Sequence, residues 1–290
     1  MEKFKGIFPA LLTPFYADGG INKKALEQLI ELNLEKGVRG FYVCGSTAEV
    51  FLLREDERRA LYQLTKDIVG SRATLIAHVG DISTDRACNY ARFTEKLGYD
   101  AISAVAPFYY KFSFDEIKRY YFDIVNAAAL PMIVYNFPNF SGVNLSVDQI
   151  GHFLSDPRFI GVKHTSNDYF ALSQFKTAFP DKIIYNGFDE MMLAGLSMGA
   201  DGGIGSTYNF MADKFIRLMD LFSQNRMEEA QALQKQINII IAALCRVGVM
   251  QGEKAVLSAM GLDFGIARAP FAPLTPEQEK GLLDTIIPLL

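Results

Sequence analysis

Lys163 is the residue of this chain whose type and setting first suggest chemistry. It stands in the run Phe-Ile-Gly-Val-Lys-His-Thr, residues 159–165, which otherwise has the composition of a buried strand. Side chains alternate between the two faces of a strand. The alternation turns Ile160 and Val162 toward covering helices, and it turns Gly161 and Lys163 into the interior of the fold.

An amine buried in this way can serve as a nucleophile. Burial disfavours the ammonium form and lowers the pKa of a lysine, and the neutral amine attacks carbonyl groups. The missing side chain at Gly161 leaves room for a substrate. The alternatives are a lysine paired with a carboxylate inside the fold, or one whose amine reaches solvent at the rim.

Tyr135 and the segment 45–49 are the next candidates. Tyr135 lies near the end of the strand expected before that of Lys163, so its phenol can approach the lysine and relay protons. A core tyrosine with a satisfied hydroxyl is the alternative. The segment Gly-Ser-Thr-Ala-Glu, residues 45–49, follows another expected strand. Its hydroxyls and backbone N–H groups can hold a carboxylate, or they only cap the next helix.

Alternating strands and helices must position these residues. Eight short apolar runs are expected to be parallel strands covered by helices: Ile7–Thr13, Gly40–Gly45, Thr74–Gly80, Ala101–Ala106, Met132–Asn136, Phe159–Thr165, Lys182–Gly187 and Gly202–Ser206. Helical patterns lie between them, including Asn22–Lys36, Arg54–Val69, Thr84–Leu97, capped by Ser83, and Phe114–Ala128. Eight such units predict an α/β fold, a (β/α)8 TIM barrel.

Only helical patterns follow the eighth strand. They are Lys214–Ser223, Met227–Val247, Lys254–Met260 and a last helix after the proline-rich stretch 270–276. No linker or charge run separates them from the strands. We therefore expect a catalytic barrel over residues 1–224 and a C-terminal helical appendage, residues 225–290, packed onto it.

The chemistry of such barrels gathers at the carboxyl ends of the strands. Polar side chains fall there after several strands: Thr13, Ser46, Thr47, Glu49, Tyr109, Tyr110, Tyr135, Lys163, Thr165, Asp189, Glu190 and Ser206. Asp189 and Glu190 can accept hydrogen bonds from a substrate, or they serve only a helix N-terminus. The aromatic run 108–112 is expected first at a subunit interface, with core or a stacking surface as alternatives.

Composition narrows the class of protein. A net charge of −4 on 290 residues argues against binding of nucleic acid or of a membrane surface. Cys44, Cys88 and Cys245 are odd in number and far apart, so we expect a reducing, cytoplasmic setting. The three histidines lack metal-ligand spacing and are expected to be structural.

Three motifs together resemble a known family. Gly45-Ser46-Thr47, Tyr135-Asn136-Phe137-Pro138 and Gly161-Val162-Lys163 are similar to those of the pyruvate-dependent aldolase family of dihydrodipicolinate synthase and N-acetylneuraminate lyase. The resemblance extends from Gly6 to about Pro273. Segments 107–110, 141–143, 187–190 and 203–209 resemble the lyase branch. The resemblance implies a class I aldolase that cleaves N-acetylneuraminate reversibly to pyruvate and N-acetylmannosamine.

The resemblance also implies catalytic roles. Lys163 would form the Schiff base, Tyr135 would relay the proton, and Ser46 and Thr47 would hold the pyruvate carboxylate. A homotetramer would bring Tyr109 of one copy into a neighbour's site, where it completes the hydroxyl network. No metal or organic cofactor is implied, because the lysine itself is the electron sink.

A groove for the polyol tail of the sugar acid is implied as well. The residues that would line it are Thr165, Gly187, Asp189, Glu190 and Ser206. Hydroxyls that enter such a groove need fixed donors and acceptors, since unpaired buried hydroxyls are costly.

Two positions depart from patterns within the family. Synthases carry an arginine where this chain has Phe140, which cannot pair with the carboxylate of a dicarboxylate precursor. The loop usually reads Gly-Ser-Thr-Gly-Glu, and here the second glycine is Ala48. If that backbone needs a positive φ, alanine costs roughly 1 kcal/mol or more, and if it is helical the change is mild.

The sequence therefore leaves four candidate functions. A sialic acid aldolase is preferred, and an aldolase for another 2-oxo-3-deoxy sugar acid is the alternative that Ala48 motivates. Dihydrodipicolinate synthase is less favoured because of Phe140. A barrel that binds a 2-oxo acid without turnover comes last, because both Lys163 and Tyr135 are present.

Overall fold

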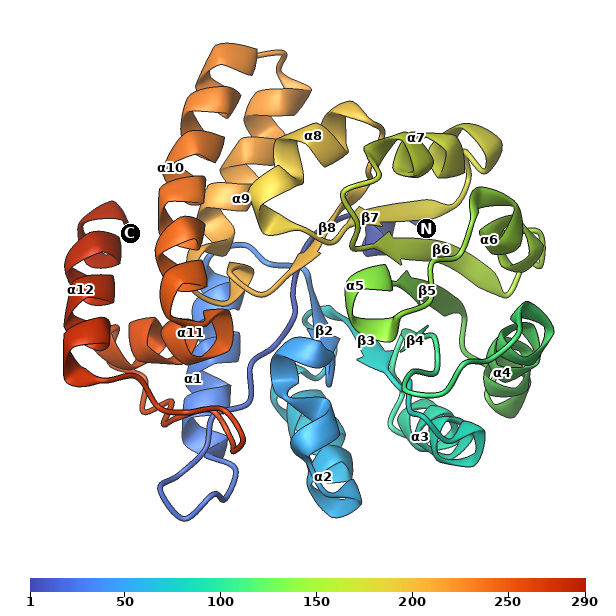
Figure 1. The fold of residues 1–290 in the computed structure, drawn as a ribbon, viewed down its shortest axis with the longest axis horizontal. Helices are drawn as coiled ribbons and strands as arrows, with labels where there is room; N and C mark the ends of the chain where they lie inside the picture. The colour runs from blue at the N-terminus through green and yellow to red at the C-terminus, as the bar shows by residue number, and fades with distance from the viewer.

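The strands of the chain form one parallel, eight-stranded sheet that curls into a barrel (Figure 1). The structure, a computed structural model, describes residues 1–290. The strands are β1 (Gly6–Pro9), β2 (Gly40–Val43), β3 (Thr74–His78), β4 (Ala101–Val105), β5 (Met132–Asn136), β6 (Phe159–His164), β7 (Ile183–Asn186) and β8 (Gly202–Gly205). Their order is β1-β8-β7-β6-β5-β4-β3-β2, and a backbone bridge from Ala10 to Tyr42 closes the ring. The predicted TIM barrel is confirmed.

Helices surround the barrel in chain order, as Figure 1 shows. They are α1 (Lys23–Glu35), α2 (Glu55–Val69), α3 (Thr84–Lys96), α4 (Phe114–Ala127), α6 (Val147–Leu154), α7 (Tyr169–Ala178), α8 (Met192–Ser197) and α9 (Tyr208–Ser223), while the short α5 (Pro138–Ser141) lies inside this ring, next to the end of β5. Short 3-10 turns are η1 (Glu2–Phe4), η2 (Ser46–Ala48), η3 (Val50–Leu52), η4 (Asp189–Met191) and η5 (Ile287–Leu289). Ser83 caps α3 as predicted, because its side chain accepts from the backbone N–H of Arg86.

Three further helices follow: α10 (Met227–Val247), α11 (Val249–Ala259) and α12 (Pro276–Ile286). α10 packs along α9 and against η4, and α11 and α12 pack on α10. Figure 1 shows them together on one side of the barrel, with α11 reaching toward its mouth. The prediction that α11 begins at Lys254 was wrong, because the chain turns at Gly248 (φ 104°) and the helix starts directly after it. No helix combines the length and apolarity that a membrane crossing requires.

Two hydrophobic clusters hold the fold together. The larger lies between the sheet and the helices, and the smaller fills the inside of the barrel. The inner cluster includes Phe8, Tyr42, Ile76, Ile133, Tyr185 and Ile204. Because packed side chains fill the barrel, a substrate can enter only at one end.

The predicted alternation along β6 was wrong at one residue. Ile160 packs in the inner cluster rather than against the helices, because a bulge shifts the register between β5 and β6: Met132 pairs with Phe159, but Ile133 pairs with Gly161. Beyond the bulge the prediction is confirmed, with Val162 in the outer cluster.

The prediction that Gly161 makes room for a substrate was wrong. A Cβ built at this position would lie 2.1 Å from the carbonyl oxygen of Ile183 on β7. The glycine therefore permits the close approach of two strand backbones, and the space near the lysine has another origin.

Candidate active site

Lys163 lies at the carboxyl end of β6 with its side chain inside the barrel. It is 5% exposed, and two tyrosine rings flank its amine. The Nζ atom is 4.1 Å from the ring centre of Tyr135 and 4.7 Å from that of Tyr42. Tyr42 comes from β2 and donates its hydroxyl hydrogen bond to Ser103, so its ring is held in place beneath the amine.

This environment changes the ionisation of the lysine. Burial lowers the pKa of Lys163 to about 7, and the nearby carboxylate of Asp189 opposes part of that effect. A lysine with this pKa is neutral in a large fraction of molecules at neutral pH. The alternative of a lysine that forms an ion pair is not observed, since no salt bridge to Lys163 is present.

Tyr135 is the neighbour of Lys163 across the β5–β6 pair, as predicted. The two residues are register partners, and Tyr135 is buried. Burial raises the pKa of the Tyr135 phenol well above its usual value, while the nearby hydroxyls of Thr165 and Ser46 oppose the rise. The phenol therefore keeps its proton at neutral pH and can donate it.

The loop after β2 presents Ser46 and Thr47 to the same space. Gly45 precedes them, and a Cβ there would lie 2.7 Å from the ring of Tyr42. Ala48 closes the short turn η2 by donating its N–H to Gly45 O, and its carbonyl accepts from Thr13 Oγ1 at 2.8 Å. The left-handed residue of the loop is Glu49 (φ 57°), not Ala48. Alanine at position 48 therefore carries no backbone strain.

Asp189 is held at the opposite side of the mouth. Its Oδ2 accepts from the backbone N–H of Thr207 at 2.9 Å and from Thr207 Oγ1 at 2.6 Å. Its Oδ1 lies where a side chain at position 205 would stand, so Gly205 is required there. Burial raises the pKa of Asp189 to about 6, although the two hydrogen bonds from Thr207 favour the carboxylate and oppose the rise. Asp189 and Glu190 do lie in the first turn of η4, as the helix N-terminus alternative has it, but the Asp189 carboxylate also accepts two hydrogen bonds from Thr207 and lines the cavity.

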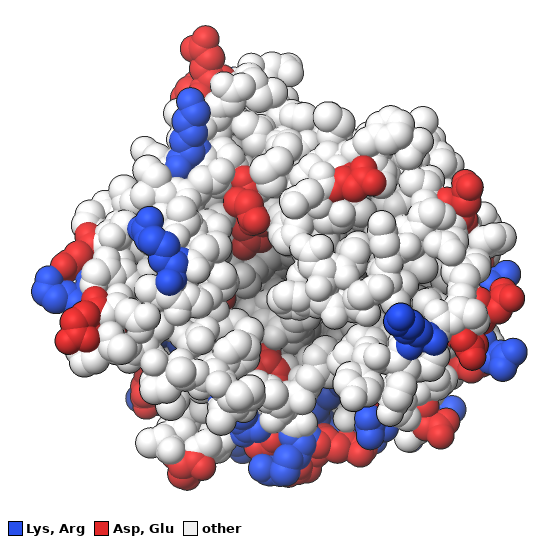
Figure 2. Space-filling model, in the orientation of Figure 1, with Lys and Arg blue, Asp and Glu red and all other residues white.

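One cavity of about 290 Å³ collects nearly all of the predicted site residues. Those that line it are Ser46, Thr47, Tyr135, Lys163, Thr165, Gly187, Asp189, Glu190 and Ser206. The space-filling view shows a hollow over the barrel mouth with acidic side chains at its edge (Figure 2). The structure therefore places a nucleophilic amine, a phenol, hydroxyls and carboxylates around one space.

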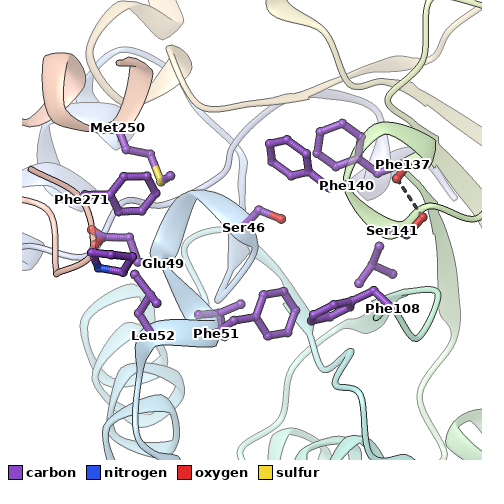
Figure 3. Close-up of a pocket in the computed structure, with 13 residues that line it drawn as sticks. Ser46, Glu49, Phe51, Leu52, Phe108, Phe137, Phe140, Ser141, Met250 and Phe271 are labelled. Carbon is purple, nitrogen blue, oxygen red and sulfur yellow. Dashed lines mark hydrogen bonds between the residues drawn. The ribbon is translucent and has the colours of Figure 1, made fainter. Parts of the chain in front are cut away.

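A second cavity, of about 410 Å³, adjoins the first and shares Ser46, Phe137, Phe140 and Met250 with it. Figure 3 shows its aromatic lining, with Ser46 between Phe140 on one side and Phe51 on the other. The larger cavity is mostly apolar, so the chemistry belongs to the smaller one.

Tyr109 is the predicted site residue that the single chain does not bring to either cavity. It lies on the loop between β4 and α4, is 83% exposed, and has a φ of 78°. Its neighbour Tyr110 is also exposed, with the two ring centres 5.0 Å apart.

The C-terminal helices supply a wall of the site that sequence reasoning missed. Ile241 and Cys245 of α10, with Val249 and Met250 of α11, line the smaller cavity. A buried ion pair connects α11 to the loop after β2: Lys254 Nζ lies 2.5 Å from Glu49 Oε1. The sequence held one signal of this wall: two adjacent charged residues, Glu253 and Lys254, in a mostly apolar helical run.

The buried histidines are structural, as predicted. His78 Nδ1 donates to Cys44 O, and its Nε2 accepts from the backbone N–H of Val105. His164 accepts from the Asn136 amide at Nδ1 and donates from Nε2 to the carbonyl of Asp168. Both rings hold strand ends in register beside the site.

Comparisons with known proteins agree with this geometry. The sequence matches the Dihydrodipicolinate synthetase family over residues 3–287. An N-acetylneuraminate lyase of Rhizobium meliloti (strain 1021) is 45% identical over 289 residues, 99% of this chain and 96% of that protein. CdNal of Clostridium difficile, solved in complex with mannosamine, superposes with a TM-score of 0.97 at 39% identity and 99% coverage of both chains. The N-acetylneuraminate lyase of Fusobacterium nucleatum, solved with pyruvate, gives 0.95 at 36% identity, covering 100% of this chain and 98% of that one.

Replacing Lys163 with methionine tests the ionisation. The folded protein releases the lysine proton near pH 7, whereas an unfolded chain holds it until about pH 10.5. Between these values the unfolded state binds more protons, so wild-type stability rises with pH relative to Lys163→Met, by up to about 1.4 kcal/mol per pH unit. Urea unfolding of both proteins at pH 7, 8 and 9 measures it. Lys235→Met, at an exposed position of α10, is the control. Parallel pH dependences of wild type and Lys163→Met would contradict the shift.

Proposed function

The chain belongs to the dihydrodipicolinate synthetase family, and we propose that it is a class I aldolase that cleaves N-acetylneuraminate reversibly to pyruvate and N-acetylmannosamine. The observation that carries the proposal is the buried Lys163 amine beside the Tyr135 phenol, in a cavity that also holds polar groups for a sugar chain. The relatives at 45% and 39% identity have matching activities or ligands in their names, N-acetylneuraminate lyase and a mannosamine complex.

The reaction begins with the neutral amine of Lys163. It adds to the C2 carbonyl of the open-chain sugar acid, and loss of water gives a protonated imine. The imine accepts the electron pair of the C3–C4 bond while the Tyr135 hydroxyl takes up the proton of the C4 hydroxyl and passes its own proton to the neighbouring hydroxyls of Ser46 and Thr165, from which a proton returns to C3. The aldehyde N-acetylmannosamine leaves, and protonation at C3 with hydrolysis releases pyruvate and the amine. The lysine is the electron sink, so the proposal needs no cofactor.

Hydroxyl and carboxylate groups divide the cavity into two ends. Ser46 and Thr47, beside Tyr135, suit the carboxylate of the 2-oxo acid. Asp189 and Glu190, with Thr165, Gly187 and Ser206, suit the polyol tail, because carboxylates accept hydrogen bonds from several hydroxyls. We assign the groove to the tail on this basis.

The alternatives lose ground for physical reasons. Phe140 lines the cavity, with its ring 4.4 Å from that of Phe137, so no cation stands there for the second carboxylate of a synthase substrate. Ala48 motivated a different sugar acid, yet its backbone is unstrained. Kinetics of pyruvate release from N-acetylneuraminate and from shorter 2-oxo-3-deoxy acids would rank the substrates.

We propose a homotetramer in which Tyr109 serves a neighbouring subunit. Its ring is exposed and lines neither cavity of its own chain, whereas the aromatic cavity beside Ser46 could receive a side chain from another copy. The Tyr109 hydroxyl would then complete the hydroxyl network at Ser46.

The three cysteines are free, which supports a reducing, cytoplasmic compartment that cell fractionation would test.

Borohydride trapping tests the aldolase. Incubation of the protein with pyruvate and sodium borohydride should reduce the imine and leave a stable adduct on Lys163, found by peptide mass spectrometry. Lys254 is an internal control, because it is buried but paired with Glu49. An unmodified Lys163 peptide, or a label on Lys254 instead, would overturn the proposal.

The Tyr135→Phe variant tests the proton relay. Loss of the phenol should lower kcat for N-acetylneuraminate cleavage by about 100-fold or more, while trapping of pyruvate on Lys163 persists. Tyr42→Phe is the matched control, since its ring also contacts the amine but its hydroxyl bonds Ser103. Equal losses in the two variants would assign the effect to packing instead of proton transfer.

The Tyr109→Ala variant tests the contribution of a second subunit. We expect kcat/KM to fall at least about tenfold, as for the loss of one hydrogen bond at a buried site, while light scattering still reports a tetramer. Tyr16→Ala, at another exposed tyrosine, provides the control. A fully active monomer would rule out this role.

A further inference from the structure

Glu253 is a carboxyl group with an environment that the proposed mechanism leaves unexplained. Its exposed fraction is 0%, and neither Oε1 nor Oε2 has a hydrogen-bond partner. It lies on α11 four residues after Val249 and three after Met250, both of which line the substrate cavity. Residues at these spacings share one face of a helix, so Glu253 stands on the face that α11 turns to the site.

The groups around Glu253 belong to the groove for the polyol tail. The Ser206 hydroxyl stabilises its charged form, whereas the carboxylate of Asp189 disfavours it. Cys245 of α10, which lines the same cavity, is also close enough to feel its charge. The adjacent Lys254 pairs with Glu49. Helices α9 and α12, which also pack on α11, bring no buried charged side chain.

A carboxyl in this position holds its proton at neutral pH. Burial raises the pKa of Glu253 to about 8, with Asp189 adding to the rise and Ser206 opposing it. A neutral carboxylic acid has one O–H donor and free acceptor sites. An apolar side chain would fill this place at no desolvation cost, so a polar group here is costly unless it binds something.

We propose that Glu253 is a positioning residue: its carboxyl, which has no partner in the free protein, hydrogen-bonds the Ser206 hydroxyl when a sugar acid occupies the cavity, and so orients the groove for the polyol tail. The inference rests on the aldolase proposed above. Ser206 lines the cavity, and Asp189, held by Thr207, lines it as well. Glu253 therefore acts on the tail and not on the reacting carbonyl.

The test compares Glu253→Leu and Glu253→Gln with the wild type. KM is measured for N-acetylneuraminate and for a shorter 2-oxo-3-deoxy acid that lacks the distal hydroxyls. In Glu253→Leu we expect the ratio of the two KM values to rise roughly tenfold, the effect of one lost hydrogen bond. Glutamine keeps a donor and an acceptor, so Glu253→Gln should restore most of the ratio. Gln251→Leu, on the same helix, is the matched control.

A pH profile separates this role from a merely structural one. Below about pH 8 the acid donates, and above it the carboxylate faces Asp189 and donates no longer. The wild-type KM for N-acetylneuraminate should therefore rise above pH 8, and Glu253→Gln should lack that rise. Asp189 and Cys245 are unchanged in the variant, so the difference between the profiles belongs to Glu253.

The outcomes distinguish the two proposals. No pyruvate release from N-acetylneuraminate by the wild type overturns the aldolase and this inference with it. Activity in the wild type with an unchanged KM ratio in Glu253→Leu overturns the role of Glu253 alone. Equal rises of KM for both substrates, or identical pH profiles in wild type and Glu253→Gln, do the same. The melting temperature of each variant verifies folding, and leucine is expected to raise it.

Discussion

The water-poor, low-dielectric surroundings of the Lys163 amine are the constraint on which the other features depend. Lys163 needs a low-dielectric surrounding to lose its proton near pH 7, yet it must face a space that a substrate can enter. The packed interior of the barrel supplies the first condition, and the rings of Tyr42 and Tyr135 supply apolar contact that still attracts a cation in the protonated state. The cavity above supplies the second. A wetter barrel would leave the lysine charged and unreactive.

The groups around that amine are each held by a partner from a distant part of the chain. Thr207 fixes Asp189, Thr13 fixes the turn that carries Ser46, and Lys254 fixes the end of the same loop through Glu49. The backbone N–H of Arg268 donates a hydrogen bond to the Glu49 carboxylate, and its guanidinium forms a salt bridge with Glu57. A buried pair such as Glu49–Lys254 adds little net stability but is costly to break. Its evident contribution is geometric, because it sets where the loop stands.

The sequence revealed the barrel and most of the site because both depend on local pattern. Period-two alternation placed Lys163 inside, and strand ends identified the polar rim. The same rule failed at Ile160, since a bulge depends on the neighbouring strand and leaves no local mark. The wall formed by Val249 and Met250 was missed because the face that a helix turns to a site is decided by tertiary packing. Tyr109 lines neither cavity of its own chain, and its role in a neighbouring subunit stays a prediction.

The bonds from Lys254 and Arg268 to the loop after β2 also bear on how the protein is made. Every residue that we assign to the reaction in this chain has been translated by residue 206, but the partners that hold Glu49 come about fifty to sixty residues later. Chains emerge from the ribosome from the N-terminus, and contacts of such long sequence separation form late. A nascent barrel thus contains Lys163 before it can fix the loop after β2 through Glu49. The loop after β2 therefore gains these two contacts only after residue 268 has been added.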